Sequence, residues 1–199
     1  MKKKIILGVL ALLALVCLLS SVYTVEENQY ACTVRFSKII HTTQTPGLHF
    51  KVPFLDSVKY FPKAMMLYDI PPSEVLTSDK QNMTVDNYIL WRVSDPLLFY
   101  QSLGSTVVAE ERLNALTYNT LKTVMGTLSQ ADIINMDDAS ERNEIYAGIA
   151  SSVNALAQNY GIEVVDVKIK RFDLPEANEN AVYARMISER NQIAEKYTA

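Results

Sequence analysis

The amino-acid sequence predicts an α+β fold: an N-terminal transmembrane helix, then a domain of mixed strands and packed helices, then the start of a long C-terminal helix. Three observations lead to this prediction. A long run without charged residues opens the chain, some later segments alternate apolar and polar residues, and others repeat apolar residues every three or four positions. Periods of two and of about 3.6 residues are typical of half-buried strands and of amphipathic helices.

The opening run extends from Ile5 to Val22 without a charge, and three lysines at positions 2–4 precede it. As a helix it would measure roughly 27 Å, close to the ~30 Å hydrocarbon core of a bilayer. A cleavable signal peptide has the same basic start, but no Ala-x-Ala site follows this run, so we predict an uncleaved anchor. Because the lysines precede the run and Glu26 and Glu27 follow it, we expect a cytoplasmic N-terminus and an extracytoplasmic body.

Short apolar and β-branched residues between Tyr30 and Ile40 indicate strands, and Pro46-Gly47 then signals a turn. After the turn, four apolar residues alternate with His49, Lys51 and Pro53, and this pattern favours a half-buried strand. The alternative is an apolar loop pressed into the bilayer beside the anchor, because a large exposed aromatic face needs a partner. The candidate membrane-seating residues in that alternative are Leu48, Phe50, Val52 and Phe54.

Apolar residues at alternate positions from Met83 to Val93 predict a long strand that ends at Ser94-Asp95-Pro96. Asp138-Ala139-Ser140-Glu141 resembles a capping box at a helix start, and Gly161 stands where a left-handed residue would end that helix. Two sets of apolar residues with three- and four-residue spacing predict amphipathic helices. They are Val108, Leu113, Leu116, Leu121, Val124, Met125 and Leu128 in the first, and Ile145, Ile149, Val153, Leu156 and Tyr160 in the second.

Val165, Val167 and Ile169 alternate with charged residues and predict a strand with one wet face, after which Pro175 begins a third helix. Its apolar residues are candidates for helical assembly, namely Val182, Met186, Ile187 and Ile193. No glycine or proline follows Pro175, so we expect residues 173–199 to be the beginning of a long helical arm that is truncated at Ala199.

The residues offer no support for catalysis. The six glycines are too dispersed for a phosphate-binding loop, and His41 and His49 lack metal-ligand spacing. Cys17 lies within the apolar run, and Cys32 is predicted to be a small buried strand residue. We therefore expect neither a disulfide framework nor a zinc site. The net charge of −3, more negative still without the three N-terminal lysines, argues against nucleic-acid binding. We expect no catalytic residue, no cofactor and no metal.

Several segments, in this order, resemble the stomatin/prohibitin/flotillin/HflK-HflC family, also called the SPFH or band-7 family. Pro46-Gly47-Leu48-His49-Phe50-Lys51-Val52-Pro53-Phe54, behind an N-terminal anchor, is the most specific of them. The others are Val25 to Tyr30 leading into Val34-Arg35-Phe36, Val85 to Pro96, and Gly161 to Arg171 followed by Leu174-Pro175. The resemblance covers essentially the whole chain.

This resemblance implies a function that the residues alone do not. It implies an oligomeric, non-enzymatic scaffold in the bacterial inner membrane, which forms a hetero-oligomer with an HflK-like partner. The scaffold would regulate a membrane AAA protease of the FtsH type by enclosure or membrane organisation. Residues 1–22 would then be the basic start and anchor, 23–172 the SPFH/band-7 domain and 173–199 the arm. The alternative is a soluble extracytoplasmic binding domain released by signal cleavage; a membrane-tethered protease has the least support.

Overall fold

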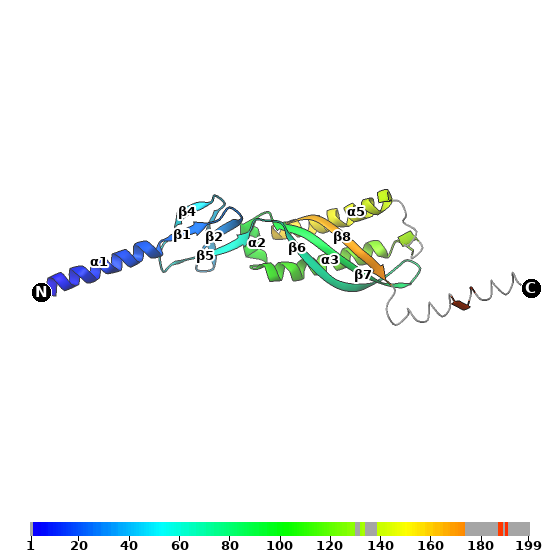
Figure 1. Ribbon diagram of the computed structural model, residues 1–199, viewed down its shortest axis with the longest axis horizontal. Helices are drawn as coiled ribbons and strands as arrows, with labels where there is room; N and C mark the ends of the chain where they lie inside the picture. The colour runs from blue at the N-terminus through cyan, green and yellow to red at the C-terminus, as the bar shows by residue number, and fades with distance from the viewer. Residues whose placement is uncertain (1, 130–131, 134–138, 174–186, 189, 191–199) are drawn as a thin grey trace, which may run out of the picture. The chain divides into compact units, whose positions relative to one another are not determined.

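The computed structural model describes residues 2–129, 132–133, 139–173, 187–188 and 190. It has the mixed α+β character that the sequence predicts, with both strands and helices in the described ranges (Figure 1). The chain divides into two compact units. One contains residues 1–66, 91–110 and 154–163, and the other contains residues 67–90, 111–153 and 164–199. Several strands and helices contribute residues to both units.

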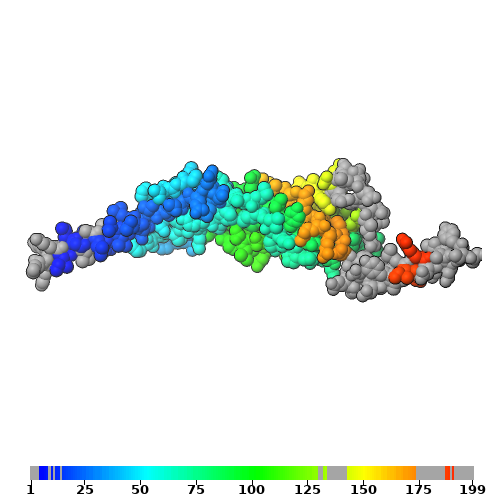
Figure 2. Space-filling model, in the orientation of Figure 1, coloured from blue at the N-terminus to red at the C-terminus, as the bar shows by residue number. Residues whose placement is uncertain are grey.

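The first element is helix α1, Lys2–Ser20. The helix ends before the apolar run does, because Val22 already belongs to the first strand. The side chains described along α1 are apolar and almost all exposed, and Figure 2 shows them uncovered on the face in view. Within the described residues, no helix combines the length and the apolar character needed to cross a membrane.

Two small sheets follow α1 in the first unit. Strand β1 (Val22–Val25) pairs antiparallel with β4 (Gly47–Phe50), and β2 (Gln29–Arg35) lies between β3 (Lys38–Thr43) and β5 (Asp56–Pro62). Tyr23, Val25 and Ala31 form the buried cluster between the sheets, with Val58 packed against it. The Tyr23 hydroxyl lies 3.1 Å from Thr43 Oγ1, which gives this buried phenol a hydrogen-bond partner.

A third sheet has the order β6-β7-β8, made of Met66–Leu76, Asn82–Val93 and Ile162–Asp173. The alternation predicted for the central strand is confirmed. Met83, Val85, Ile89, Trp91 and Val93 of β7 are all buried, and the strand ends at Val93 as expected. Strand β6, which contains Pro71 and Pro72, lies at an edge of the sheet, where a missing backbone donor is tolerated.

Helices α3 (Thr106–Met125) and α5 (Ala139–Ala157) are the two amphipathic helices that the sequence predicts, and Figure 1 shows them alongside this sheet. The buried residues of α3 recur every four positions: Ala109, Leu113, Thr117, Leu121 and Met125. Two residues placed on the apolar stripes are instead exposed, Val108 near the start of α3 and Leu156 near the end of α5. The proposed capping-box side chains before and at the start of α5 lie outside the described side chains.

A helix that the sequence analysis missed begins shortly after the end of β7. Asp95 caps helix α2 (Pro96–Ser102), and its carboxylate accepts hydrogen bonds from the N–H groups of Leu97 and Leu98. Pro96 occupies the first turn, where its missing N–H is harmless. The sequence analysis predicts only a strand end at Asp95-Pro96. The Asp95 side chain also satisfies two of the free amides at the start of the helix that follows.

Gly161 ends the 3₁₀ helix η1 (Gln158–Tyr160) after α5 with φ = 72°, as predicted. A Cβ atom there would collide with the carbonyl oxygen of Asp95 and lie 2.7 Å from the amide nitrogen of Phe99. The Gly161 carbonyl also accepts hydrogen bonds from the amides of Ser94 and Asp95. Glycine is therefore required both for the left-handed backbone and for the close approach.

In strand β8 the predicted alternation is only partly right. Val167 is buried, but Val165 is 44% exposed, and the buried residue before it is Val164. The inward-facing set thus shifts by one residue between Val164 and Val167, where the Val167 amide donates a hydrogen bond to the Asp166 side chain. The third helix predicted from Pro175 lies outside the described residues, apart from short helical pieces at 187–188 and 190.

Candidate functional site

The apolar segment after the Pro46-Gly47 turn is not a half-buried strand, so the interpretation favoured from the sequence is wrong. Leu48 and Phe50 of β4 are 69% and 78% exposed. The pairing explains this: His49 is opposite Tyr23 and its ring lies 5.7 Å from the Tyr23 ring, on the buried side of the ribbon. Because neighbouring residues on a strand point to opposite faces, Leu48 and Phe50 point outward.

The chain then forms a loop whose apolar side chains are also exposed. Val52 and Leu55 are exposed, and Phe54 is 82% exposed with a left-handed backbone of φ = 66°. A bulky residue at positive φ is a strained exception. The loop therefore holds its aromatic ring in water at a local conformational cost.

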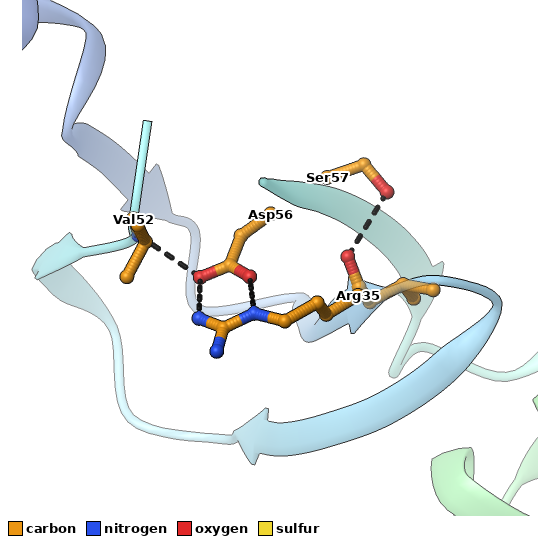
Figure 3. A network of polar contacts seen from close by, with 5 residues as sticks. Arg35, Val52, Asp56 and Ser57 are labelled. Atoms are coloured by element: carbon orange, nitrogen blue, oxygen red, sulfur yellow. Dashed lines mark hydrogen bonds and ion pairs between the residues drawn. The ribbon is translucent and has the colours of Figure 1, made fainter. Parts of the chain in front are cut away.

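Arg35, at the end of β2, fixes this loop through Asp56 (Figure 3). Its Nε and Nη2 atoms donate to the two carboxylate oxygens of Asp56 at 2.6 and 3.0 Å. The Val52 amide donates to Asp56 Oδ2 at 2.9 Å, and the Asp56 amide donates to the Val52 carbonyl at 3.0 Å. In Figure 3 the carboxylate lies between Arg35 and Val52, so one acidic side chain joins the sheet to the loop.

The electrostatics of this network favour its charged form. The hydrogen bonds from Arg35 lower the pKa of Asp56 below its ordinary value, and the Val52 amide and the charge of Lys51 act in the same direction. Reciprocally, Asp56 raises the pKa of Arg35. The pair is therefore ionised at neutral pH and stabilises the loop throughout the physiological range.

A third exposed phenylalanine, which the sequence analysis missed, lies at the same end of the sheet. Phe36 and Ser37 form the two-residue turn between β2 and β3, with φ values of 48° and 64°. Both central residues of such a turn need positive φ, which normally selects Asn or Gly. Phe36 is 84% exposed. The available signal was an aromatic residue at a hairpin tip, where glycine would be the easier choice.

These features converge on one end of the first unit. Arg35 pairs with Lys38 across the hairpin and with Asp56 across the sheet, which places the turn and the loop next to the same residue. Ser21, directly after α1, donates its hydroxyl to the Lys51 carbonyl at 2.6 Å, and the Lys51 amide donates to the Ser21 carbonyl at 2.7 Å. We call this the apolar end; its members are Phe36, Leu48, Phe50, Val52, Phe54 and Leu55.

The cysteine and histidine residues of the strands lie on β2, β3 and β4. Cys32 is fully buried in β2, as predicted, and burial raises the pKa of its thiol. His49 Nε2 lies 2.9 Å from the Thr45 carbonyl, and His41 is on β3. In the described ranges, no cluster of three or more His, Cys, Asp or Glu residues could hold a metal ion.

Of the helical assembly residues, Ile187 is exposed in a short helical piece. The remaining three, Val182, Met186 and Ile193, lie outside the described residues. Their part in assembly stays a prediction.

Comparison with known proteins shows the family to which the chain belongs. The family described as "SPFH domain / Band 7 family" matches residues 23–199, and the chain belongs to this family. Among its relatives is the "Modulator of FtsH protease HflC" of Escherichia coli (strain K12), 29% identical over 99% of this chain and 71% of the relative. "Protein HflC" of Haemophilus influenzae is 30% identical over 89% of this chain and 63% of the relative. "Protein HflC" of Buchnera aphidicola (subsp. Schizaphis graminum) is 31% identical over 96% and 68%. The Escherichia coli relative is described as modulating a protease, and the chain groups with these regulatory, non-enzymatic proteins.

Proposed function

We propose that this chain is an inner-membrane scaffold of the HflC type, anchored by the apolar run from Ile5 to Val22 and seated on the bilayer by its apolar end. It forms a hetero-oligomer with an HflK-like relative and regulates an FtsH-type membrane protease by enclosure or membrane organisation. Its N-terminus lies in the cytoplasm and its body is extracytoplasmic. The name of the Escherichia coli relative, a modulator of a protease, supports the regulatory part of this proposal.

The observation that carries the membrane part is the exposed apolar end beside α1. Fully burying one large apolar side chain is worth about 1.5–3 kcal/mol. Six such residues lie at or near one end of the unit, and two of them, Phe36 and Phe54, are held at positive φ. Soluble domains rarely expose so many large apolar side chains together. The charge-free run that continues from Ile5 places a lipid-compatible helix directly before this end.

Tryptophan fluorescence tests the seating directly. The sole native tryptophan, Trp91, is fully buried, so Phe54→Trp in the full chain adds a probe at the loop. In nanodiscs of lipids brominated in their acyl chains, we expect strong quenching at position 54. Asn28→Trp is the matched control, because it lies just beyond the opposite end of the seven-residue β2, about 20 Å away. Equal quenching at the two positions would disprove the seating.

The assembly part is tested by the native mass of the detergent-solubilised chain, alone and co-expressed with an HflK-like relative. We expect a large complex only with the relative. Proteoliposomes containing an FtsH-type protease and a membrane substrate then report regulation, as a lower rate of substrate loss when the complex is present. Monomers in both preparations would contradict assembly by this chain.

The signal-cleavage alternative is tested by the intact mass of the mature protein. Retention of α1 supports the anchor, and loss of about twenty residues, the length of a typical signal peptide, supports a released domain.

A further inference from the structure

An open pocket of 560 Å³ lies at the apolar end of the first unit. Both small sheets line it. Ser21, Tyr23 and Lys51 come from the β1–β4 side, and Thr33 and His41 come from β2 and β3. The apolar part of its wall is formed by Ile40, Phe50, Val52 and Pro53. The pocket thus combines hydroxyl groups, a cationic side chain and an imidazole with an apolar rim.

The local charge is opposite to that of the whole chain. Between Tyr30 and Lys63 the sequence contains five basic residues, Arg35, Lys38, Lys51, Lys59 and Lys63, and only one acidic residue, Asp56. The full chain has a net charge of −3. Asp56 lines the pocket as well, but both its oxygens accept hydrogen bonds from Arg35. Its negative charge is therefore matched by Arg35 through direct hydrogen bonds, whereas Lys51 acts on Asp56 through its charge and can also face a ligand.

The position of the pocket relative to the apolar end sets the class of ligand. Lys51 follows Phe50 directly and precedes Phe54 by three residues. If the Phe54 ring enters the acyl region, Lys51 reaches only headgroup depth, where lysine ammonium groups meet lipid phosphates. Phosphate oxygens accept hydrogen bonds from ammonium, hydroxyl and imidazole N–H groups alike. Ile40, Phe50 and Val52 then offer an apolar wall to the first acyl carbons.

We propose that this pocket binds the phosphate group of an anionic phospholipid, with Lys51 as its main cationic partner and His41 beside it. The proposal rests on the proposed function, since only a seated apolar end brings the pocket to the headgroups. It adds a lipid preference to what would otherwise be purely hydrophobic insertion.

Native mass spectrometry of the detergent-solubilised full chain tests the lipid preference. The chain is incubated with equal amounts of phosphatidylglycerol and phosphatidylcholine that carry the same acyl chains. We expect phosphatidylglycerol to be retained preferentially, and Lys51→Gln to reduce this preference about tenfold, the effect of losing one charge-assisted contact. Lys63→Gln is the matched control, because Lys63 is in the same basic segment but lies over the Tyr30 ring, outside the pocket.

The outcomes are distinct. Equal retention of the two lipids, or an equal loss in Lys51→Gln and Lys63→Gln, would overturn the pocket assignment. Inorganic phosphate that displaces phosphatidylglycerol at equal concentration would identify a free-anion site and overturn the lipid assignment. Loss of the preference in Lys51→Gln, with unchanged quenching of the Phe54→Trp probe, supports the pocket and leaves the seating intact. Absence of quenching of that probe in brominated nanodiscs would instead remove the seating on which the pocket depends.

Discussion

Strand β7 and the segment from Leu48 to Phe54 have the same alternating pattern in the sequence but opposite outcomes in the structure. In β7 the apolar side chains are buried, whereas in β4 and the loop after it they face solvent. The difference comes from what covers each strand. Helices α3 and α5 bring their own buried stripes, but the outer side of β4 has no covering layer among the described residues. An alternating pattern therefore identifies an apolar face without identifying its partner.

The largest expected effect is the difference in stability between a substitution in the buried face of β7 and one in the exposed face of β4. Ile89→Ala, in the buried face of β7, should lower the free energy of unfolding by about 2–5 kcal/mol, because it leaves a cavity in packed core. Leu48→Ala should change it by no more than about 0.5 kcal/mol. Chemical denaturation of the detergent-solubilised chain measures both. A similar loss in the two variants would mean that the Leu48 face is packed in solution.

Two glycines with positive φ allow a second comparison, between a crowded and an open backbone position. Gly161→Ala combines the left-handed strain of about 1–2 kcal/mol with a collision against the backbone of Asp95 and Phe99. Gly47, at the start of the exposed β4, also has positive φ, but a Cβ atom there meets nothing within 4 Å. We therefore expect Gly161→Ala to lower the thermal unfolding midpoint more than Gly47→Ala does. The reverse order would contradict the close packing around Gly161.

The smallest expected effect concerns the ion pair that holds the exposed loop. Because the folded-state pKa of Asp56 is lowered, its stabilising contribution is complete above the unfolded value of about 3.9 and is lost as the pH falls through the folded pKa. The unfolding midpoint of Asp56→Asn should thus lie below that of the wild type at neutral pH and approach it in acid. The Val52 amide should also exchange faster in the variant, since it loses its carboxylate acceptor. A midpoint difference that is independent of pH would contradict this account.

Much of the fold could be predicted because local chemistry determines it. The buried face of β7, the two amphipathic helices and the left-handed Gly161 all follow from spacing or from one residue's special backbone. Asp95-Pro96 was harder to interpret, because a proline can both end a strand and begin a helix. The sequence analysis predicts only the strand end, although helix α2 begins at Pro96. Strand β1 was hidden because its first residue, Val22, extends the apolar run.

The candidate site was only partly predictable, for a different reason. The sequence identified Leu48, Phe50, Val52 and Phe54 as one apolar set. The exposure of Leu48 and Phe50 depends on the pairing of β4 with β1, and the loop that carries Val52 and Phe54 is held by the Arg35–Asp56 pair. Both contacts join residues far apart in the sequence. In β8 a one-residue shift places Val165 on the exposed face instead of the buried one, and the local alternation does not predict such a shift. Phe36 escaped notice because a bulky aromatic residue is unusual in a turn that needs positive φ at both positions.

The strained turn at Phe36 and Ser37 has a consequence for how this chain can be altered. A glycine at position 36 would relax a backbone that costs an aromatic residue about 1–2 kcal/mol, so the present residue is not the one that maximises the stability of the isolated fold. A screen for thermostable variants would therefore select against the exposed ring. Consensus or stability-guided redesign of this chain should exempt the hairpin tip, because selecting only for resistance to heat would erase the surface by which we propose it holds the membrane.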